Sequence, residues 1–522
     1  MRRRTIPVNM ILENGVIRTM EPSLPLARSL AIVGDKIAGG VGTHETALPG
    51  PERIDLGGRC VLPGFTDSHV HFPTWAMAQH EVRLEGTASM DEAIARVRDA
   101  LATTERASGW LRGRGWRSGD WTSPAEPTKE ALDAIAPDRP VALMARDSHS
   151  VWLNSAALAH ASGDLQVPGG VVELDEHGEP TGVLREESCW HFRDRYIDTT
   201  DDEYVEAMRT GIKLAASRGV TAVHDKDGWL GALRFWQRLA DDGVLTLRVW
   251  QSLPEVKADE LAEVDVRGGF GNALLKVGYL KAFMDGTLGS ATARLLDGSG
   301  VQITSREELE DYILRAAQAG FPIGVHAIGD LANREALDAF EATREAWQPL
   351  GLRQRIEHAQ LLAPEDVQRF AQLGITASVQ FSHAPSDRDL ADRIWSGTTS
   401  LPYAYRSLLD SGATLVNGSD APIEELDPLE GLRAGVLRTL DEREAWRPEQ
   451  AVTVEEALIA GTVAPAWLAR DERRRGKLVP GFFADLVVLD RDPLTCEPEE
   501  LAETRVVATM LGGAWTHDPP PW

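Results

Sequence analysis

Apolar and polar residues alternate along the middle of the chain in a pattern that predicts strands followed by amphipathic helices. Short runs rich in Val, Ile and Leu recur, and segments with helical spacing, such as residues 307–319, lie between them. Repeated strand–helix units at this spacing favour parallel pairing. Eight strands are predicted, at residues 60–65, 220–224, 245–250, 275–283, 322–326, 355–358, 376–379 and 413–417. Eight such units fit a (β/α)8 TIM barrel.

Both ends of the chain have a different sequence pattern, with short β-rich runs bounded by Gly, Pro and Asp. We expect them to pair into one small β-sandwich domain formed by residues 1–62 and 472–522, around a barrel at residues 63–471. The gap from the first predicted strand to the second is far longer than a βα connection. We interpret it as a subdomain inserted after strand 1, at about residues 80–215.

Composition narrows the class of protein. Hydrophobic residues make up 43% of the 522 residues, as in globular proteins, and no apolar run approaches the length that spans a bilayer. The net charge of −26, with no Lys/Arg cluster, argues against a nucleic-acid partner. Three widely spaced cysteines make no disulfide framework, and the N-terminal segment has no signal-peptide pattern. Together these features predict a cytoplasmic protein.

Potential metal ligands follow several of the predicted strands. His69 and His71 are separated by one residue, so in an extended segment their side chains point to one side. Two imidazoles in this arrangement can bind one metal, although the pair alone would also fit a surface turn. Other residues of this kind end strands 4, 5, 6 and 8: Lys281, His326, His358 and Asp420. Their convergence on one rim of a barrel predicts a metal site.

Several motifs strengthen this interpretation. The segment PGFTDSHVH at residues 63–71 and the segment VPGFFADLVVLD at residues 479–490 resemble signatures of the amidohydrolase superfamily. The motifs KAFMDGTLGS, HAIGD, IEH and GSDAP resemble its YtcJ-like (amidohydrolase-3) branch, which includes N-substituted formamide deformylases. Three motifs of the insert, GRGW, DSHSVWLNS and PTGVLRE, are also typical of that branch. The resemblance covers nearly the whole chain and implies a metal-dependent hydrolase.

The resemblance implies roles for the individual ligands. His69 and His71 would bind the more buried of two divalent metals, and His326 and His358 would bind the second. Lys281 would bridge them as an N-carboxylated lysine, because an ammonium group has no acceptor for a metal. A plain buried lysine beside one metal, or a lysine that contacts substrate, is the alternative. Asp420 would hold the first metal and act as general base and then general acid. Zinc suits these ligands, as do iron, manganese and cobalt.

The reaction implied is hydrolysis of a C–N bond in an amide, formamide or cyclic amide by a metal-activated hydroxide. Ester, carbamate or lactone hydrolysis on the same site is an alternative, as is a catalytically silent binding protein. The small-molecule substrate is expected to carry a hydrophobic group, because the chain holds 15 Trp; packing in the core is the competing explanation for these rings. The resemblance also implies a homodimer. Candidate substrate contacts, each with a structural alternative, are Asp285, His149, Trp152, Trp116 and His224.

Overall fold

The computed structural model describes residues 9–38, 50–103, 109–122, 126–146, 148, 150–161, 163, 165–197 and 199–521. The chain forms two units, each of which is described by itself below. The first unit combines Met1–Pro73 with Met208–Trp522, and the second unit, the insert, comprises Thr74–Ala207.

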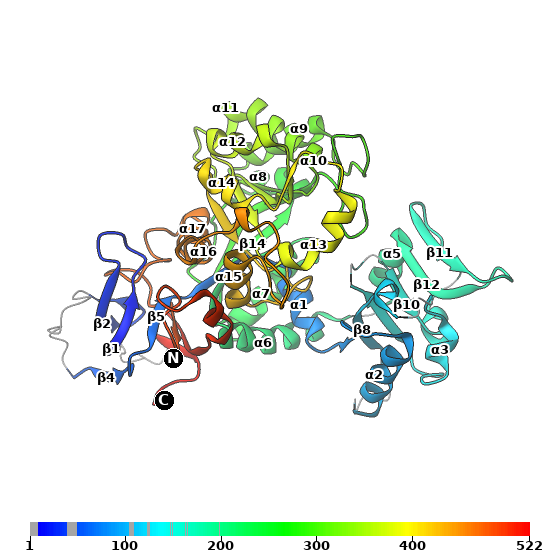
Figure 1. Ribbon diagram of the computed structural model, residues 1–522, viewed down its shortest axis with the longest axis horizontal. Coiled ribbons are helices and arrows are strands. Elements are labelled where there is room, and N and C mark those ends of the chain that lie inside the picture. Colours follow the sequence, from blue (N-terminus) through cyan, green and yellow to red (C-terminus); the bar gives the residue numbers. More distant parts are fainter. Residues whose placement is uncertain are drawn as a thin grey trace. The chain divides into compact units, whose positions relative to one another are not determined.

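The first unit is built on eight parallel strands that form a nearly closed barrel (Figure 1). In spatial order they are β6 (Phe65–Val70), β13 (Val220–Asp225), β14 (Arg248–Pro254), β15 (Leu275–Phe283), β16 (Ile323–Ala327), β17 (Arg355–His358), β19 (Thr376–Val379) and β21 (Leu415–Asn417). Most of these strands are buried along their whole length, as expected for parallel strands covered on both faces. The predicted (β/α)8 barrel is confirmed.

The barrel closes where its last strand meets its first. An isolated parallel bridge joins Val70 to Ala421. Two backbone hydrogen bonds flank it, from Asp420 N to His69 O at 2.7 Å and from His71 N to Ala421 O at 2.9 Å. The closing seam therefore brings the histidines after β6 beside the aspartate after β21.

The predicted first strand is wrong in its position. Residues Cys60–Pro63 form β5, which belongs to the sheet of the chain ends, and the barrel strand begins only at Phe65. Gly64 separates the two strands, and a Cβ at Gly64 would lie 2.2 Å from the Thr221 side chain. The run from residue 60 to residue 65 is apolar throughout because it is buried in two successive sheets, so hydrophobicity alone does not mark the boundary.

Helices cover the outside of the barrel. The chief ones are α6 (Asp201–Ser217), α7 (Ala232–Asp241), α8 (Ala258–Glu263), α9 (Arg306–Gln318), α10 (Asp330–Ala342), α12 (Pro364–Leu373), α13 (His383–Ile394), α14 (Tyr405–Asp410), α15 (Pro428–Leu437), α16 (Val454–Gly461) and α17 (Val463–Leu468). Helix α9 begins with a capping box of Ser305 and Glu308. Its buried residues Leu309 and Ile313 join the large apolar core between helices and strands.

Strands from both ends of the chain form one hydrogen-bonded sheet. Its order is β24 (Ala514–His517), β23 (Val506–Leu511), β22 (Leu486–Leu489), β5, β1 (Asn9–Arg18), β2 (Leu26–Val33) and β3 (Lys36–Ile37), with β4 (Glu52–Asp55) paired to β1. Leu12, Leu30 and Met510 are among the buried residues of its core. Arg248 of β14 makes a buried ion pair with Asp485, Nε to Oδ2 at 2.6 Å, which ties this sheet to the barrel.

The insert has its own six-stranded sheet. The order is β11 (Gly170–Leu174), β12 (Pro180–Glu186), β10 (Ser150–Leu153), β9 (Val141–Ala145), β8 (Leu111–Trp116) and β7 (Val82–Arg83). Helices α2 (Met90–Thr103), α3 (Lys129–Asp133), α4 (Ser155–Leu158) and α5 (Glu187–Tyr196) accompany these strands. Trp116, Trp121 and Trp152 belong to one of its apolar clusters.

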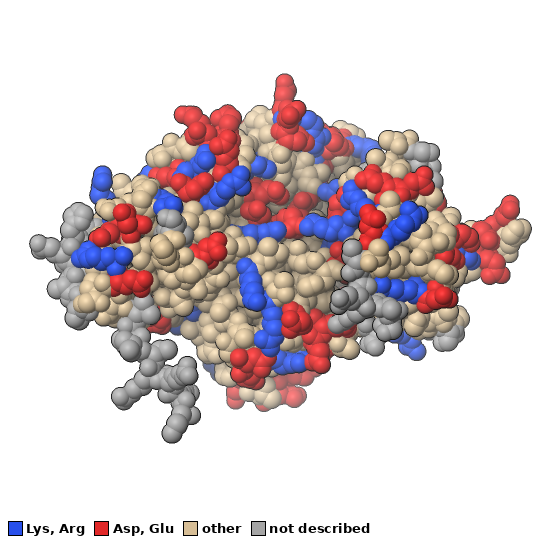
Figure 2. Space-filling model, turned by 90° about the horizontal axis from the view of Figure 1, so that it is seen from below, with Lys and Arg blue, Asp and Glu red and all other residues tan. Residues whose placement is uncertain are grey.

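Acidic and basic side chains are interspersed on the face shown in Figure 2, so neither sign dominates that view. Among the described residues, the structure has no helix with the length and apolar character needed to cross a membrane.

Candidate metal centre

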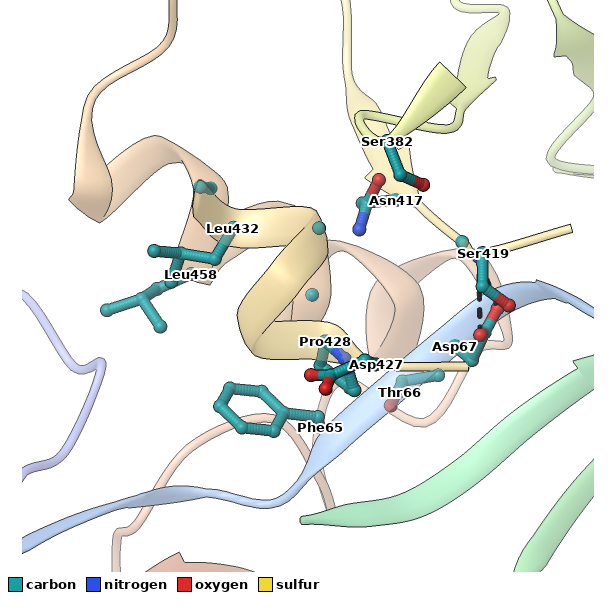
Figure 3. A pocket seen from close by; sticks show the side chains of 14 residues that line it. Phe65, Thr66, Asp67, Ser382, Asn417, Ser419, Asp427, Pro428, Leu432 and Leu458 are labelled. Carbon is teal, nitrogen blue, oxygen red and sulfur yellow. Dashed lines mark hydrogen bonds between the residues drawn. The ribbon is translucent and has the colours of Figure 1, made fainter. Parts of the chain in front are cut away.

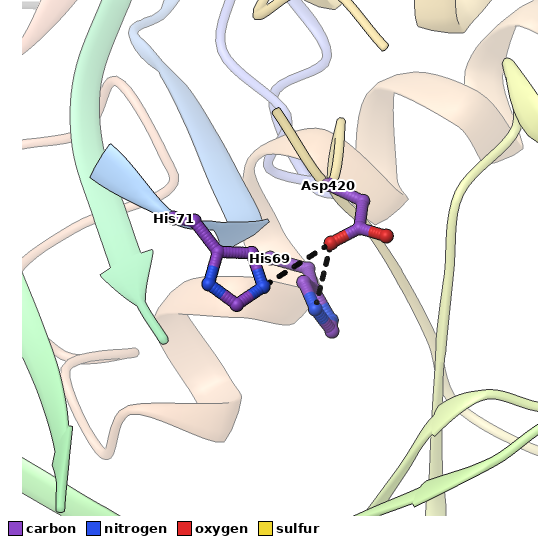
Figure 4. Close-up of side chains that lie close together, drawn as sticks. All are labelled: His69, His71 and Asp420. Atoms are coloured by element: carbon purple, nitrogen blue, oxygen red, sulfur yellow. Dashed lines mark ion pairs between the residues drawn. The ribbon is translucent and has the colours of Figure 1, made fainter. Parts of the chain in front are cut away.

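Three predicted ligands converge at the closing seam of the barrel. His69 lies near the end of β6, His71 directly follows that strand, and Asp420 follows β21 (Figure 4). The Nε2 atoms of the two imidazoles lie 3.2 Å and 3.5 Å from Asp420 Oδ1. All three ligand atoms lie within 4.8 Å of one another. Two imidazole nitrogens and a carboxylate oxygen at this spacing suit a divalent transition metal.

Carboxylates hold both imidazoles in the orientation that a metal needs. His69 Nδ1 lies 2.8 Å from Glu357 Oε2, and His71 Nδ1 lies 2.7 Å from Asp227 Oδ1. An imidazole that donates its Nδ1–H to a carboxylate keeps the Nε2 lone pair for a metal. Burial, together with the positive charge of Lys226, lowers the pKa of His69, which favours the neutral ring. These histidines therefore fit the metal implied by the sequence.

Glu357 is the centre of a buried charge network that sequence reasoning missed. Its Oε1 lies 2.8 Å from Lys226 Nζ and 2.7 Å from Arg355 Nε. Lys226 also donates to Tyr279 Oη at 2.6 Å. Burial alone would raise the pKa of Glu357, but Arg355 and Lys226 outweigh it and hold that pKa well below its usual range. The signal in the sequence was the run Arg355–His358, where charged residues occupy a barrel strand.

A second group of ligand atoms lies on the other side of Asp420. It combines His358, His383 and Asp420, again within 4.8 Å of one another. His358 Nδ1 lies 2.9 Å from Gln380 Oε1, and His383 Nε2 lies 3.8 Å from Asp420 Oδ2. His383 was not predicted as part of the metal site. Its position four residues after the end of β19 is the only hint in the sequence.

His326 lies beside this second group without belonging to it. Its ring centroid is 4.5 Å from that of His358. However, His326 Nε2 faces the carbonyl oxygen of Gly286 at 3.0 Å. Burial, and then the charge of Lys281, lowers the pKa of His326 to about 3, so the ring is neutral. If His326 binds a metal, the lone pair available while this hydrogen bond persists is on Nδ1.

Among the described residues, Lys281 makes no hydrogen bond or ion pair with another predicted ligand. Its Nζ is buried without a hydrogen-bond partner among the described residues, 4.3 Å from the centroid of the Phe283 ring. Burial lowers the pKa of Lys281 from 10.5 to about 8, so a much larger share of it is free amine than for an exposed lysine. A buried amine without a hydrogen-bond partner suits a side chain that gains its contacts when a further ligand binds.

The backbone at two ligands adopts the left-handed region. His358 has φ 73° and Asp420 has φ 59°. Such conformations cost about 1–3 kcal/mol for residues other than glycine and cluster at functional sites. Hydrogen bonds such as Asp420 N to His69 O hold the backbone in place.

Two predicted substrate contacts in the barrel have structural roles in this conformation. The Asp285 carboxylate accepts hydrogen bonds from the backbone N–H groups of Arg294, Ile328 and Gly329, at 2.8–3.0 Å. Burial raises the pKa of Asp285 to about 7, although these bonds oppose the shift. His224 is buried, and its Nδ1 lies 3.1 Å from Arg355 Nη1. Both side chains are bound to protein groups in this conformation, and their contact with substrate stays a prediction.

Two predicted contacts in the insert are also buried in this conformation. Trp116 and Trp152 are 2% and 0% exposed, and their Nε1 atoms donate to the carbonyl oxygens of Leu143 and Thr128. Both rings are core residues of the insert because burying the indole face and satisfying its N–H stabilise that unit. The third predicted contact, His149, lies outside the described residues.

A small cavity lies next to Asp67, at the start of α15 (Figure 3). Its volume is about 20 Å³, and Asn417, Ser382 and Asp427 are among its lining residues. This space holds about one water molecule, so it is not a substrate pocket. Asp67 also accepts the backbone N–H groups of His69 and Ser419, and so shapes the seam that carries the ligands.

Comparisons with known proteins agree with this geometry. A family model described as "Amidohydrolase family" matches residues 52–517. The chain is 32% identical to Protein LONG AFTER FAR-RED 3 of Arabidopsis thaliana, over 97% of this chain and 91% of that protein. It is 30% identical to the putative amidohydrolase YtcJ of Bacillus subtilis, over 92% and 94%. It is 27% identical to the N-substituted formamide deformylase of Arthrobacter pascens, over 98% of each. The predicted resemblance is confirmed.

Solved structures extend the likeness to three dimensions. An uncharacterized metal-dependent hydrolase from Pyrococcus furiosus superimposes with a TM-score of 0.74 at 30% identity, covering 93% of this chain and 100% of that one. The barrel and its candidate ligands thus occur in a chain whose relatives include a metal-dependent hydrolase.

Proposed function

The chain belongs to the amidohydrolase family, and we propose that this metal-dependent hydrolase cleaves a C–N bond in an amide, formamide or cyclic amide. The observation that carries the proposal is the placement of Asp420. Its Oδ1 faces His69 and His71, while its Oδ2 faces the second group of imidazoles. One oxygen of this carboxylate can therefore bind a metal, while the other accepts and returns a proton. The 27% identity with an N-substituted formamide deformylase supports the same bond class.

The residues that would hold the metal are already oriented. His69, His71 and Asp420 would bind the first ion, and His358 and His326 would bind a second one. Zinc is the metal we propose, with iron, manganese and cobalt compatible with the same donors. Bound there, a divalent metal would acidify water and polarise a substrate carbonyl.

Asp420 Oδ2 is the proton-transfer atom in this proposal. An amide nitrogen leaves poorly as an anion, so the residue that accepts a proton from water must return one to the nitrogen. A carboxylate within hydrogen-bond reach performs both steps as general base and then general acid. Asp420 is 7% exposed, which keeps bulk water from competing for that proton.

We propose further that Lys281 is carboxylated on Nζ. The free amine adds to carbon dioxide, forming an N–C bond and releasing one proton, and the lysine gains a carboxylate whose single negative charge is shared by two oxygens. The buried position of Nζ and its lack of a partner among the described residues support this step. The carbamate would bridge two metals, a role that the ammonium form cannot take.

Metal content per chain tests the site directly. Elemental analysis of protein purified without chelator is expected to give about two metals, and the Lys281→Ala variant about one or none. One metal in both proteins would remove the bridge and leave Lys281 as a residue beside a mononuclear site. No metal in either protein, even after reconstitution, would overturn the hydrolase proposal.

Activity against matched substrates tests the bond class. The panel pairs N-formyl and N-acetyl anilides with esters and lactones of similar bulk, because we expect a hydrophobic substituent on the substrate. Faster turnover of the anilides is expected. Turnover restricted to esters, carbamates or lactones would contradict the C–N proposal while leaving the metal site intact.

We also propose that the protein works as a homodimer in a reducing compartment, the cytoplasm. Cys60, Cys189 and Cys496, all among the described residues, form no disulfide in the structure. Light scattering of the purified protein tests the homodimer, and a monomer in that measurement would contradict it.

A further inference from the structure

His383 differs from the other imidazoles around Asp420 in the group that holds its Nδ1. Its partner is Gln360 Nε2, at 3.1 Å. An amide nitrogen donates hydrogen bonds and does not accept them. In this orientation of the Gln360 amide, whose Oε1 has no hydrogen-bond partner among the described residues, Nδ1 of His383 is the acceptor and a neutral ring carries its proton on Nε2.

His358 provides the contrast within the same group. Its Nδ1 faces an amide oxygen, Gln380 Oε1 at 2.9 Å, so Nδ1 carries the proton and Nε2 keeps a lone pair. The amide of Gln380 is fixed in that orientation because its Nε2 also donates to Ser378 O. The two rings are stacked, 6.3 Å apart and 8° from parallel, but they offer opposite groups. His358 offers an acceptor for a metal, and His383 offers an N–H.

The Nε2–H of His383 points to the reacting side of Asp420. Nε2 lies 3.8 Å from Asp420 Oδ2, beyond hydrogen-bond distance, and it is buried without a hydrogen-bond partner among the described residues. His383 is the first residue of α13 and is 4% exposed, so packing fixes the ring. A buried donor without an acceptor costs about 1–3 kcal/mol. An arriving substrate oxygen would remove that cost.

We propose that His383 is a catalytic hydrogen-bond donor, and not a metal ligand, whose Nε2–H binds the carbonyl oxygen of the substrate. The donor strengthens its bond as negative charge develops on that oxygen during attack at the carbonyl carbon. Gln360 positions it by donating to Nδ1, which disfavours the tautomer that would bind a metal. This inference rests on the proposed hydrolytic function, and its test is designed to separate the two.

Two variants of His383 measure the role in the metal-loaded protein. In His383→Leu the donor is lost, and kcat is expected to fall about 10²–10³-fold, as for removal of one oxyanion donor. In His383→Gln an amide N–H can take its place, and part of kcat should return. Metal content should equal that of the parent in both variants. Loss of one metal in either variant would overturn the proposal, because it would make His383 a ligand.

The tautomer can be read without any substrate. Histidine-selective ¹⁵N labelling gives ring-nitrogen signals, and the set missing from His383→Gln belongs to His383. A protonated Nε2 and an unprotonated Nδ1 are expected, and the reverse pattern would overturn the proposal. If the parent protein hydrolyses no amide or ester, the proposed function fails, while the metal and tautomer measurements still decide whether His383 is a donor or a ligand.

Gln360→Glu gives a matched reversal. A carboxylate accepts where the amide nitrogen donated, so the proton of His383 should move to Nδ1 and the donor on Nε2 should disappear. We expect kcat to fall about as far as in His383→Leu and the ¹⁵N pattern to invert. Unchanged kcat with an inverted pattern would contradict the catalytic role.

Discussion

The imidazoles on the two sides of Asp420 are held by different chemistry. On the first side, carboxylates accept from Nδ1, namely Glu357 for His69 and Asp227 for His71. On the second side, neutral amides contact the rings, namely Gln380 for His358 and Gln360 for His383. The difference is chiefly one of charge, since the distances from Nδ1 differ little, at 2.7 and 2.8 Å on the first side and 2.9 and 3.1 Å on the second.

This difference predicts unequal metal affinities. A carboxylate acceptor makes an imidazole more basic and fixes its orientation, and its negative charge attracts the cation. An amide acceptor fixes the orientation but brings no net charge. The His69–His71 side should therefore hold the tighter ion, and the second side should depend on a further anionic ligand. Lys281 in its carboxylated form would be such a ligand, which links its proposed role to the weakness of the second side.

Asp420 is shared by both sides, so its replacement should have the largest effect. In Asp420→Asn the amide can neither carry the negative charge nor take up a proton at Oδ2. We expect kcat to fall by about 10²–10⁴-fold, the usual contribution of general acid–base catalysis. Steady-state kinetics on the best anilide of the panel checks this loss, with His224→Asn as a control in the same barrel interior. A loss below tenfold would remove Asp420 from proton transfer.

Glu357→Gln should have the next largest effect, because it removes the carboxylate that holds His69 on the first side. The change leaves Lys226 and Arg355 buried without their counter-charge, and unpairing a buried ion costs about 3–5 kcal/mol. Urea unfolding of the metal-free proteins measures the change in the free energy of unfolding. First-site metal affinity should also fall about 10–100-fold.

A matched variant separates charge from stability in that experiment. Asp227→Asn removes the corresponding carboxylate from His71 and leaves Glu357 paired with Lys226 and Arg355. It should lower metal affinity with a smaller loss of unfolding free energy. Equal stability losses in the two variants would contradict the importance of the buried network.

Graded chelation should reveal two metals of different affinity. We expect the weaker metal to leave at about 10–100-fold lower chelator concentration than the tighter one, the range attributed to partners of the ligands. Elemental analysis after dialysis against each concentration gives the two steps. In Lys281→Ala, release of the weaker metal at low chelator concentration should be missing, and release of the tighter metal should remain. Simultaneous release of both metals would mean that the two sides do not differ as proposed.

The sequence allowed the barrel and most of the candidate ligands that cluster in the structure to be predicted, because both depend on local patterns. Seven of the eight barrel strands were placed from apolar runs, and His69, His71, His358 and Asp420 were found at strand ends. The first strand was misplaced because one apolar run serves two sheets. The burial of Trp116 and Trp152 was not predicted, because indole burial depends on packing that residue spacing does not encode.

The partners of the ligands could not be predicted for a related reason. Glu357, Asp227 and Gln380 lie on different strands or on the segments that follow them, and only the closed barrel brings them to their histidines. Whether an imidazole nitrogen offers a lone pair to a metal or donates a hydrogen bond depends on these partners. His383 illustrates this, since nothing in its local sequence distinguishes a donor from a ligand.

Gln380→Glu should have the smallest effect. It tests the comparison because it gives a histidine of the second side the carboxylate partner that the first side has. The carboxylate would accept from His358 Nδ1 as the amide oxygen does, and it would add the negative charge that the second side lacks. We expect second-site affinity to rise about tenfold, the lower end of the range for such partners, with first-site affinity unchanged. The two chelation steps should therefore move closer together, while Gln380→Met, which has no acceptor, should move them apart. If Gln380→Glu leaves the steps where they are, the charge of the partner does not set the difference between the two sides, and the geometry of His326 and Lys281 becomes its cause.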